Sequence, residues 1–303
     1  MNKIDLFGSD DDRRISKYYC RRESADSDYI DMPNGNLAGF LKAVVIFLLG
    51  IAIVIVIWQG FAWYYNEYFD RIMKFPYPLE TFQRLSEYLF DHRLMYMRTI
   101  YEHVGASLKR WLIAFALSTF FGVILGTILG MFKKMYPVAI SPINIVQMIP
   151  GMAWLPVAIL MFGLSDKSAM FIIFTISFVI ITINVAGGIR RIPDVYNRVA
   201  DMMGAGIAVK VFKVVLPFAA LDIVNGLRLG MGSAWRVLIS AEMVISTGLG
   251  IGFAISALRS VLDYVGSFAC IAVICAIGLL IDKFIFVNIE KFVRHKLGMD
   301  GDV

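Results

Sequence analysis

The chain has 303 residues, of which 58% are hydrophobic and 17% charged, and its mean hydropathy is +0.70. A soluble domain carries about 25% charged residues, so this composition excludes intrinsic disorder and argues against an ordinary soluble enzyme. Spanning a bilayer takes a helix of about 20 apolar residues. Five long segments contain no charged residue, which predicts a polytopic membrane protein: residues 43–66, 111–132, 135–165, 168–189 and 264–281.

The formal net charge is +5, and the isoelectric point is about 9.0. In a membrane protein, such an excess of Lys and Arg is typical of cytoplasmic loops. No window interleaves basic and aromatic residues, so we expect no nucleic-acid partner. The three cysteines and three histidines form neither a CxxC motif nor a ligand cluster, and we expect no metal. We also find no set of residues typical of a catalytic site.

Residues 1–39 are polar and mixed in charge, which is too long and too acidic for the start of a signal peptide. They predict a cytoplasmic N-terminal tail, to which we assign no role. The first membrane helix is predicted at 40–65, and an extracytoplasmic segment at 66–106 follows. Within that segment, apolar residues recur on one face of Leu79–Phe90, which predicts an amphipathic helix on the membrane surface.

A core of five further membrane helices is predicted over residues 107–290. The first of them, 107–132, contains Gly122, Gly126 and Gly130 at four-residue spacing. Small residues on one face let two helix backbones approach closely in lipid. We therefore expect this face to pack against another helix.

The next predicted helix, 137–162, is interrupted by Pro150-Gly151 and by Pro156. Broken helices within a membrane are tolerated only against protein or a water-filled cavity. This helix is therefore a candidate wall of a pathway. Residues 168–187 predict the helix that follows it.

A basic loop at 190–213 separates that helix from the next, which is predicted at 217–245. Residues 246–266 predict an outer loop with a short helix, residues 267–287 the last membrane helix, and residues 291–303 a basic tail. Because basic loops stay in the cytoplasm, the pattern predicts six spans with both termini cytoplasmic.

Four charged residues fall within the helix predicted at 217–245: Asp222, Arg228, Arg236 and Glu242. Ionisable groups inside a span are costly and by default suggest a function. We interpret Arg236 either as a contact for an anionic substrate or as one member of an ion pair, with Glu242 or a neighbouring helix. Asp222 and Arg228 are interpreted as groups near the inner surface. Other residues could line the same path, with helix packing as the alternative for the aromatic ones and a structural or gating role for Glu242: Gln147, Met148, Trp154, Trp235, Ser240 and Glu242.

The loop reads Arg198-Val199-Ala200-Asp201-Met202-Met203-Gly204 and, after eleven residues, Leu216-Pro217. It resembles the coupling loop of binding-protein-dependent ABC importer permeases, whose pattern is Glu-Ala-Ala, three residues, Gly, and a spaced Leu-Pro. Arg198 and Val199 stand where the family has Glu and Ala. The resemblance covers about residues 75–296 and includes further segments: Ala106–Arg110, Gly122–Gly126, Ile149–Pro156, Phe162-Gly163, Gly226–Arg228, Ala234-Trp235, Ala241–Met243 and Gly248–Gly250.

The resemblance implies the type I permease fold and an all-α membrane subunit that pairs with a second copy. It further implies two ABC ATPase subunits at the coupling loop, an extracytoplasmic substrate-binding protein, and a location in the inner cell membrane. The chain has no phosphate-binding loop, so we expect it to bind no cofactor and to leave ATP and Mg²⁺ to the ATPase. The nearest branch imports taurine, sulfonates, nitrate and related small anions.

Two other classes of protein remain as alternatives. A secondary transporter or channel would work without an ATPase, but it predicts inverted repeats, which we do not find, and leaves the basic loop unexplained. An integral-membrane enzyme would require a cluster of His, Asp or Glu at one membrane face, and the sequence offers none.

Overall fold

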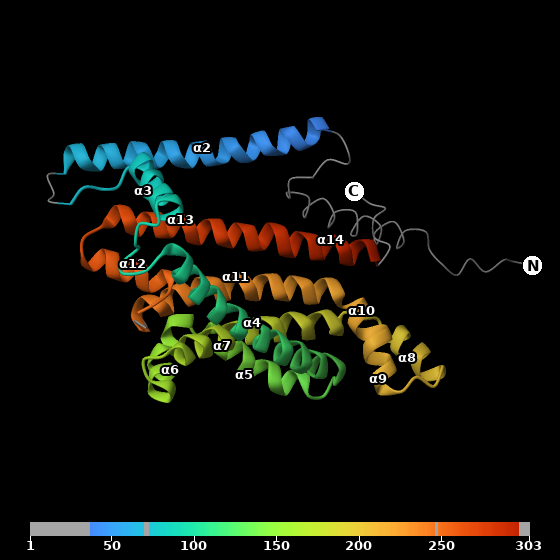
Figure 1. Ribbon diagram of the computed structural model, residues 1–303. Helices are drawn as coiled ribbons and strands as arrows, with labels where there is room; N and C mark the ends of the chain where they lie inside the picture. The colour runs from blue at the N-terminus through green and yellow to red at the C-terminus, as the bar shows by residue number, and fades with distance from the viewer. Residues whose placement is uncertain (1–36, 70–72, 246–247, 297–303) are drawn as a thin grey trace, which may run out of the picture. The chain divides into compact units, whose positions relative to one another are not determined.

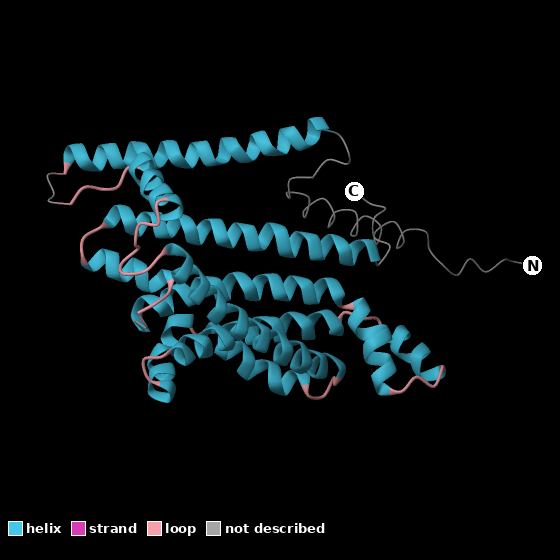
Figure 2. Ribbon diagram, viewed as in Figure 1, coloured by secondary structure: helices cyan, strands magenta, loops and turns pink. Residues whose placement is uncertain are grey.

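A computed structural model describes residues 37–69, 73–245 and 248–296 of the protein. In these ranges every regular element is a helix, as Figure 2 shows. Most of the tail predicted at 1–39 lies outside them, as does the end of the tail predicted at 291–303. The chain divides into two compact units, residues 1–71 and 72–303, and each is described by itself.

The first unit contains one long helix, α2 (Leu37–Tyr68). Its Val44–Tyr68 portion is long and apolar enough to cross a membrane. The helix is apolar on all sides, as expected when lipid rather than water surrounds it. The helix predicted at 40–65 lies within it.

The second unit is a bundle in which α7 packs against both α4 and α11 (Figure 1). Two short helices, α8 and α9, lie at one end of this bundle, and α6 and α12 lie near the opposite end. Its elements are α3 (Pro78–Phe90), α4 (Ile100–Met131), α5 (Tyr136–Met148), η1 (Gly151–Trp154), α6 (Leu155–Phe162), α7 (Asp166–Arg190), α8 (Asp194–Met202), α9 (Ile207–Lys210), η2 (Val211–Val215), α10 (Leu216–Phe218), α11 (Ala220–Ile245), α12 (Ile251–Ser260), α13 (Tyr264–Leu280), η3 (Ile281–Phe286) and α14 (Val287–Lys296).

Length and composition qualify four of the described helices as membrane spans: α2, α4, α7 and the continuous stretch Tyr264–Lys296. A fifth span is formed if α5 and the η1–α6 segment cross together, although they are bent by 97°. The bend falls at Pro150, where the missing N–H and the fixed φ of proline interrupt a helix. The span predicted at 217–245 corresponds to α11, whose 26 residues rise about 39 Å, but α11 is not among the helices that qualify, so six spans stay a prediction.

Helix α4 meets α7 along its three regularly spaced glycines. A Cβ atom added at Gly126 would lie 2.7 Å from the Val185 Cβ, and one added at Gly130 would lie 2.7 Å from the Ile189 Cβ. At Gly122 it would lie 3.0 Å from the side chain of Ile181. These distances leave no room for a side chain, so the glycines set how closely the two backbones approach.

Helix α3 packs against α13 through one face. Tyr88 is buried, and Arg84 forms an ion pair with Asp263 across a 2.6 Å gap between Nη1 and Oδ2. Burial of the Tyr88 hydroxyl raises its pKa. The opposite face of α3 exposes Leu79 and Phe82, whereas Leu85 and Leu89 pack against the core, and the position of α3 on the membrane surface stays a prediction.

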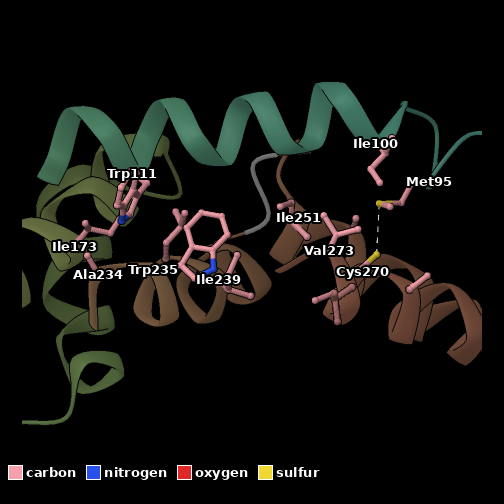
Figure 3. Close-up of a cluster of buried hydrophobic side chains, with 14 of the residues drawn as sticks. Met95, Ile100, Trp111, Ile173, Ala234, Trp235, Ile239, Ile251, Cys270 and Val273 are labelled. Carbon is pink, nitrogen blue, oxygen red and sulfur yellow. Dashed lines mark hydrogen bonds between the residues drawn. The ribbon is translucent and has the colours of Figure 1, made fainter. Parts of the chain in front are cut away.

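The main core lies between α4, α11, α12 and α13. Trp111 of α4 meets Trp235 of α11 edge to face with ring centroids 6.2 Å apart, and Figure 3 shows these residues beneath the ribbon of α4. Before the start of α4, the Met95 sulfur lies 3.4 Å from the Cys270 sulfur, marked by the dashed line in Figure 3. Met95 precedes α4 and is fully buried, so this loop residue belongs to the core.

Three helix boundaries differ clearly from the sequence prediction. The helix predicted at 107–132 begins seven residues earlier, at Ile100, because Thr99 and Glu102 form a capping box there. The helix expected to open at Pro217 begins at Ala220, because Leu216–Phe218 forms a separate turn and Ala219 leaves the helical region at φ −84° and ψ 5°. The last helix continues past its predicted end at Val287 to Lys296, through the π-helical turn Ile281–Phe286.

Candidate coupling surface and translocation pathway

The loop predicted at 190–213 is itself helical, and its first helix, α8, ends in a defined cap. Gly204 has a φ of +71°, a conformation that glycine adopts without strain. The Gly204 N–H donates to the Asp201 carbonyl, and the Ala205 N–H donates to the Ala200 carbonyl, both at 3.0 Å. This pattern is a Schellman cap, and it explains a glycine at this point of the motif.

Apolar side chains cover the outside of this loop, while Ala200 is buried against the rest of it. Met202 is 87% exposed and Met203 80% exposed, and flexible methionines suit a surface that adapts to a partner. We call the exposed set the coupling surface: Val195, Tyr196, Val199, Met202, Met203, Ile207, Val209 and Phe212. Of the remaining motif residues, Leu216 is half-buried, whereas Asp201 and Pro217 are exposed.

One ion pair joins α8 to the turn before α5, and a second joins α8 to α9. The Lys133 ammonium lies 2.8 Å from the Asp194 carboxylate, and Lys210 lies 2.5 Å from Asp201. The hydrogen bond and the charge of Lys133 lower the pKa of Asp194. The pair therefore contributes at every pH above the ordinary carboxyl range and is lost only as the pH falls through the lowered value.

One face of α11 is left exposed by the packing of the second unit, and it carries most of the polar side chains of that helix. Asn225 and Arg236 are exposed, and Ser233 and Ser240 are partly exposed. The Arg236 guanidinium donates to Ser233 Oγ at 3.3 Å. Among the described residues, no salt bridge involves Arg236, so the ion pair considered as its alternative role is absent from this part of the chain.

The interruption in the α5–α6 span lies beside this polar face. A Cβ atom added at Gly151 would lie 2.7 Å from Val237, the residue after Arg236. Gln147 and Met148, at the end of α5, are exposed, whereas Trp154 is partly buried against α6 and α7. The structure thus places η1 against α11 at Val237, and the position of Gln147 and Met148 beside Arg236 and Ser240 stays a prediction.

Two other pathway candidates lie within the packed subunit. Trp235 is 5% exposed, and its indole N–H donates to the Ile274 carbonyl at 3.3 Å. Glu242 is 2% exposed. Neither side chain lies on the exposed face of α11, so for Trp235 the structure favours helix packing.

Glu242 is the centre of a buried polar cluster. Its carboxylate accepts from the Ser107 hydroxyl at 2.8–2.9 Å, from Arg110 Nη1 at 2.8 Å and from the Gly252 N–H at 3.0 Å. A buried charge is tolerated only when it is paired and hydrogen-bonded, and each requirement is met here. Gly250 is confined by the cluster, since a Cβ there would lie 2.7 Å from the carboxylate.

The helical spacing of three polar residues is a sequence signal for this cluster. Residues 103, 107 and 110 are four and three apart, so they share one face of α4. That face meets the glycine-rich segment 248–252, which the sequence predicts to lie in an outer loop. Arg228 and Asp222 also have partners within the subunit: Arg228 Nε lies 2.7 Å from Asp282, and Asp222 pairs with Arg191.

A comparison with protein families matches residues 118–295 to the family of binding-protein-dependent transport system inner membrane components. That range contains the broken span, the coupling surface and α11. The chain therefore belongs to this family and is an ABC importer permease of the taurine, nitrate and bicarbonate branch.

Individual relatives agree with that assignment. The bicarbonate transport system permease protein CmpB of Synechococcus elongatus is 31% identical over 252 residues, which cover 81% of this chain and 88% of the relative. The nitrate import permease protein NrtB of Synechocystis is 34% identical over 192 residues, with 60% and 66% covered. The taurine transport system permease protein TauC of Escherichia coli is 29% identical over 184 residues, with 61% and 66% covered.

Proposed function

We propose that this chain is the membrane-spanning subunit of an ATP-driven importer in the inner cell membrane. Two copies form the translocation path, a separate ATPase binds at each coupling surface with its ATP and Mg²⁺, and an extracytoplasmic binding protein delivers the substrate. The observation that carries the proposal is the coupling surface, where Met202 and Met203 are among the most exposed apolar side chains. A secondary transporter or channel gives no reason for such a surface outside the spans.

The orientation follows from the same surface. An ATPase works in the cytoplasm, so α8 and α9 lie on the cytoplasmic side and the start of α7, at Asp166, lies on the other. With α11 as the sixth span, both termini are cytoplasmic. This arrangement keeps the Lys and Arg residues of the coupling loop inside, as the distribution of positive charge favours.

The substrate class in this proposal is a small anion. Arg236 is a cation within a membrane-crossing helix, it lies on the exposed polar face of α11, and ionisable residues in such positions mark substrate pathways. The relatives are named for bicarbonate, nitrate and taurine, which all carry an anionic group. We assign Gln147, Met148 and Ser240 to the same path.

Co-purification of the tagged chain from its native membrane tests the ATPase partner. The wild-type chain should retain an ATPase, and Met202→Asp should lose most of it, because a carboxylate would be buried without a partner in an apolar contact. Met97→Asp is the matched control, since Met97 is similarly exposed at the opposite end of the bundle and should retain the ATPase fully. Absence of any ATPase from the wild-type preparation, or equal losses in both variants, would overturn the proposal.

A further inference from the structure

Helix α12 lacks a capping side chain of its own, because its N-cap residue is Gly250. Three successive backbone N–H groups at its start instead donate to side chains of other helices. Gly250 donates to His103 Nδ1 at 3.0 Å, Ile251 to Ser107 Oγ at 2.9 Å, and Gly252 to Glu242 at 3.0 Å. The orphan N–H groups of a helix must find such partners, so α4 and α11 together hold α12 in place.

Arg110 extends this cap to a fourth helix. Its Nη1 donates to Glu242 at 2.8 Å and to the Leu249 carbonyl at 2.7 Å, while its Nε lies 2.8 Å from Asp166 Oδ1. Asp166 is the first residue of α7. One guanidinium thus joins the start of α7 to the turn that precedes α12.

The two carboxylate partners of Arg110 differ greatly in exposure. The Glu242 side chain is 1% exposed, whereas that of Asp166 is 54% exposed. Breaking a buried pair leaves an uncompensated charge in a low dielectric, but water screens an exposed pair and readily replaces it. Arg110 therefore has a permanent partner in Glu242 and an exchangeable one in Asp166.

Asp166 is also linked to the second half of the broken span. The short connection from α6 to α7 contains Gly163, which has a φ of +70°. The Ser168 hydroxyl of α7 donates to the Ala158 carbonyl of α6 at 3.2 Å and also to the Gly163 carbonyl. The start of α7 is thereby connected to α6, so a displacement of α6 would act directly on Asp166.

Space for such a displacement lies beside the ion pair. A hollow of about 420 Å³ is lined by Arg110 and Asp166, together with Glu102, Lys109 and Leu249. It admits water to the Asp166 carboxylate. Asp166 could leave Arg110 without a clash in this direction, and Arg110 would remain bound to Glu242.

We propose that Arg110 is a positioning residue for transport, and that its ion pair with Asp166 is a latch that opens when the transporter changes state. The inference rests on the proposed function, because only a transporter that alternates between states needs a separable link at this place. With the latch closed, the α6–α7 turn is attached to the cap of α12. With it open, α12 stays capped by α4 and α11 while the α6–α7 turn is released.

The substitution Leu249→Cys reports the state of the latch without any ATPase. The experiment uses the purified full chain in lipid nanodiscs, with Cys20 and Cys275 replaced by serine, and measures labelling by a water-soluble maleimide. Asp166→Asn should accelerate labelling about two- to fivefold, the range by which one exposed ion pair shifts an equilibrium. Asp166→Glu, which retains a carboxylate, should restore most of the original rate.

The matched control is Glu102→Gln, which removes the same charge from the same hollow without touching Arg110. Glutamine also preserves the capping function at this position, so its labelling rate should equal that of the parent. The latch is overturned if Asp166→Asn labels at the parent rate, or if both variants accelerate equally. Because labelling needs no nucleotide, this result stands whether or not an ATPase partner is found.

Discussion

Glu242 shows what one buried carboxylate requires of its neighbours. Two residues of α4, Ser107 and Arg110, donate to this α11 carboxylate, and two glycines at the start of α12, Gly250 and Gly252, lie close against it. A glycine is needed at positions 250 and 252 because any larger residue would displace the carboxylate or the Ile239 carbonyl. The residue is therefore better described as a structural centre than as part of the pathway.

Replacing Glu242 by alanine should destabilise the fold strongly. The change leaves Arg110 without its buried partner and the Gly252 N–H without an acceptor, a loss of about 3–5 kcal/mol for a buried pair. Thermal unfolding of the purified protein in detergent measures it. Asp194→Ala, which removes an exposed pair, serves as the control and should hardly move the midpoint. Equal midpoints for Glu242→Ala and wild type would contradict this account of the cluster.

Arg236 differs from Glu242 in having an exposed position and no acidic partner among the described residues. Arg236→Gln should therefore leave the unfolding midpoint close to that of the wild type. Transport of an anion should weaken, with a higher KM, because a cationic contact in the path is lost. An unchanged KM together with a lower midpoint would instead assign Arg236 a structural role.

At the scale of the element, α4 and α7 form the most extensive helix contact of the second unit. Gly126 approaches both the Val185 side chain and the Thr182 carbonyl, so even a methyl group would force the helices apart. Gly126→Ala should cost about 1–3 kcal/mol, as overpacking does. The measurement is again thermal unfolding in detergent.

The same helix provides a control for that substitution. Gly105 has no atom within 4 Å of the position of a Cβ, and alanine is favoured over glycine in a helix by up to about 1 kcal/mol. Gly105→Ala should thus be neutral or stabilising. If both variants behave alike, the tight contact of α4 with α7 is not what limits substitution at Gly126.

The helices themselves were largely predictable from the distribution of charge. The charge-free run at 168–189 lies within α7, the run at 111–132 lies within α4 except for its last residue, and the break expected at Pro150 occurs. The bend of 97° was not predictable, because a proline interrupts a helix without fixing the direction in which the chain continues.

The site was less predictable than the helices. The coupling motif is local, and its glycine cap could be read from a seven-residue segment. The partners of Glu242 lie 132 and 135 positions away along the chain, and no local pattern specifies which distant helix faces which. The exposed and buried faces of α11 likewise depend on α7, α12 and α13, so Trp235 and Arg236 could not be separated from sequence alone.

At the scale of the whole molecule, we propose a membrane subunit that supplies the translocation path and is driven by ATPase subunits. The family assignment covers the broken span, the coupling surface and α11 in one continuous match, residues 118–295. In the proposed function, the exposed polar face of α11 and the exposed apolar coupling surface would both contact other molecules. The first would face the substrate and a second copy, and the second an ATPase.

Uptake into proteoliposomes tests that claim most directly. The complex is reconstituted with its ATPase and with its binding protein loaded with the anion that it retains, and labelled bicarbonate, nitrate and taurine are compared. The account predicts accumulation of that anion against its gradient only when ATP is supplied to the ATPase. Flux that proceeds without ATP and stops at equal concentrations would contradict it.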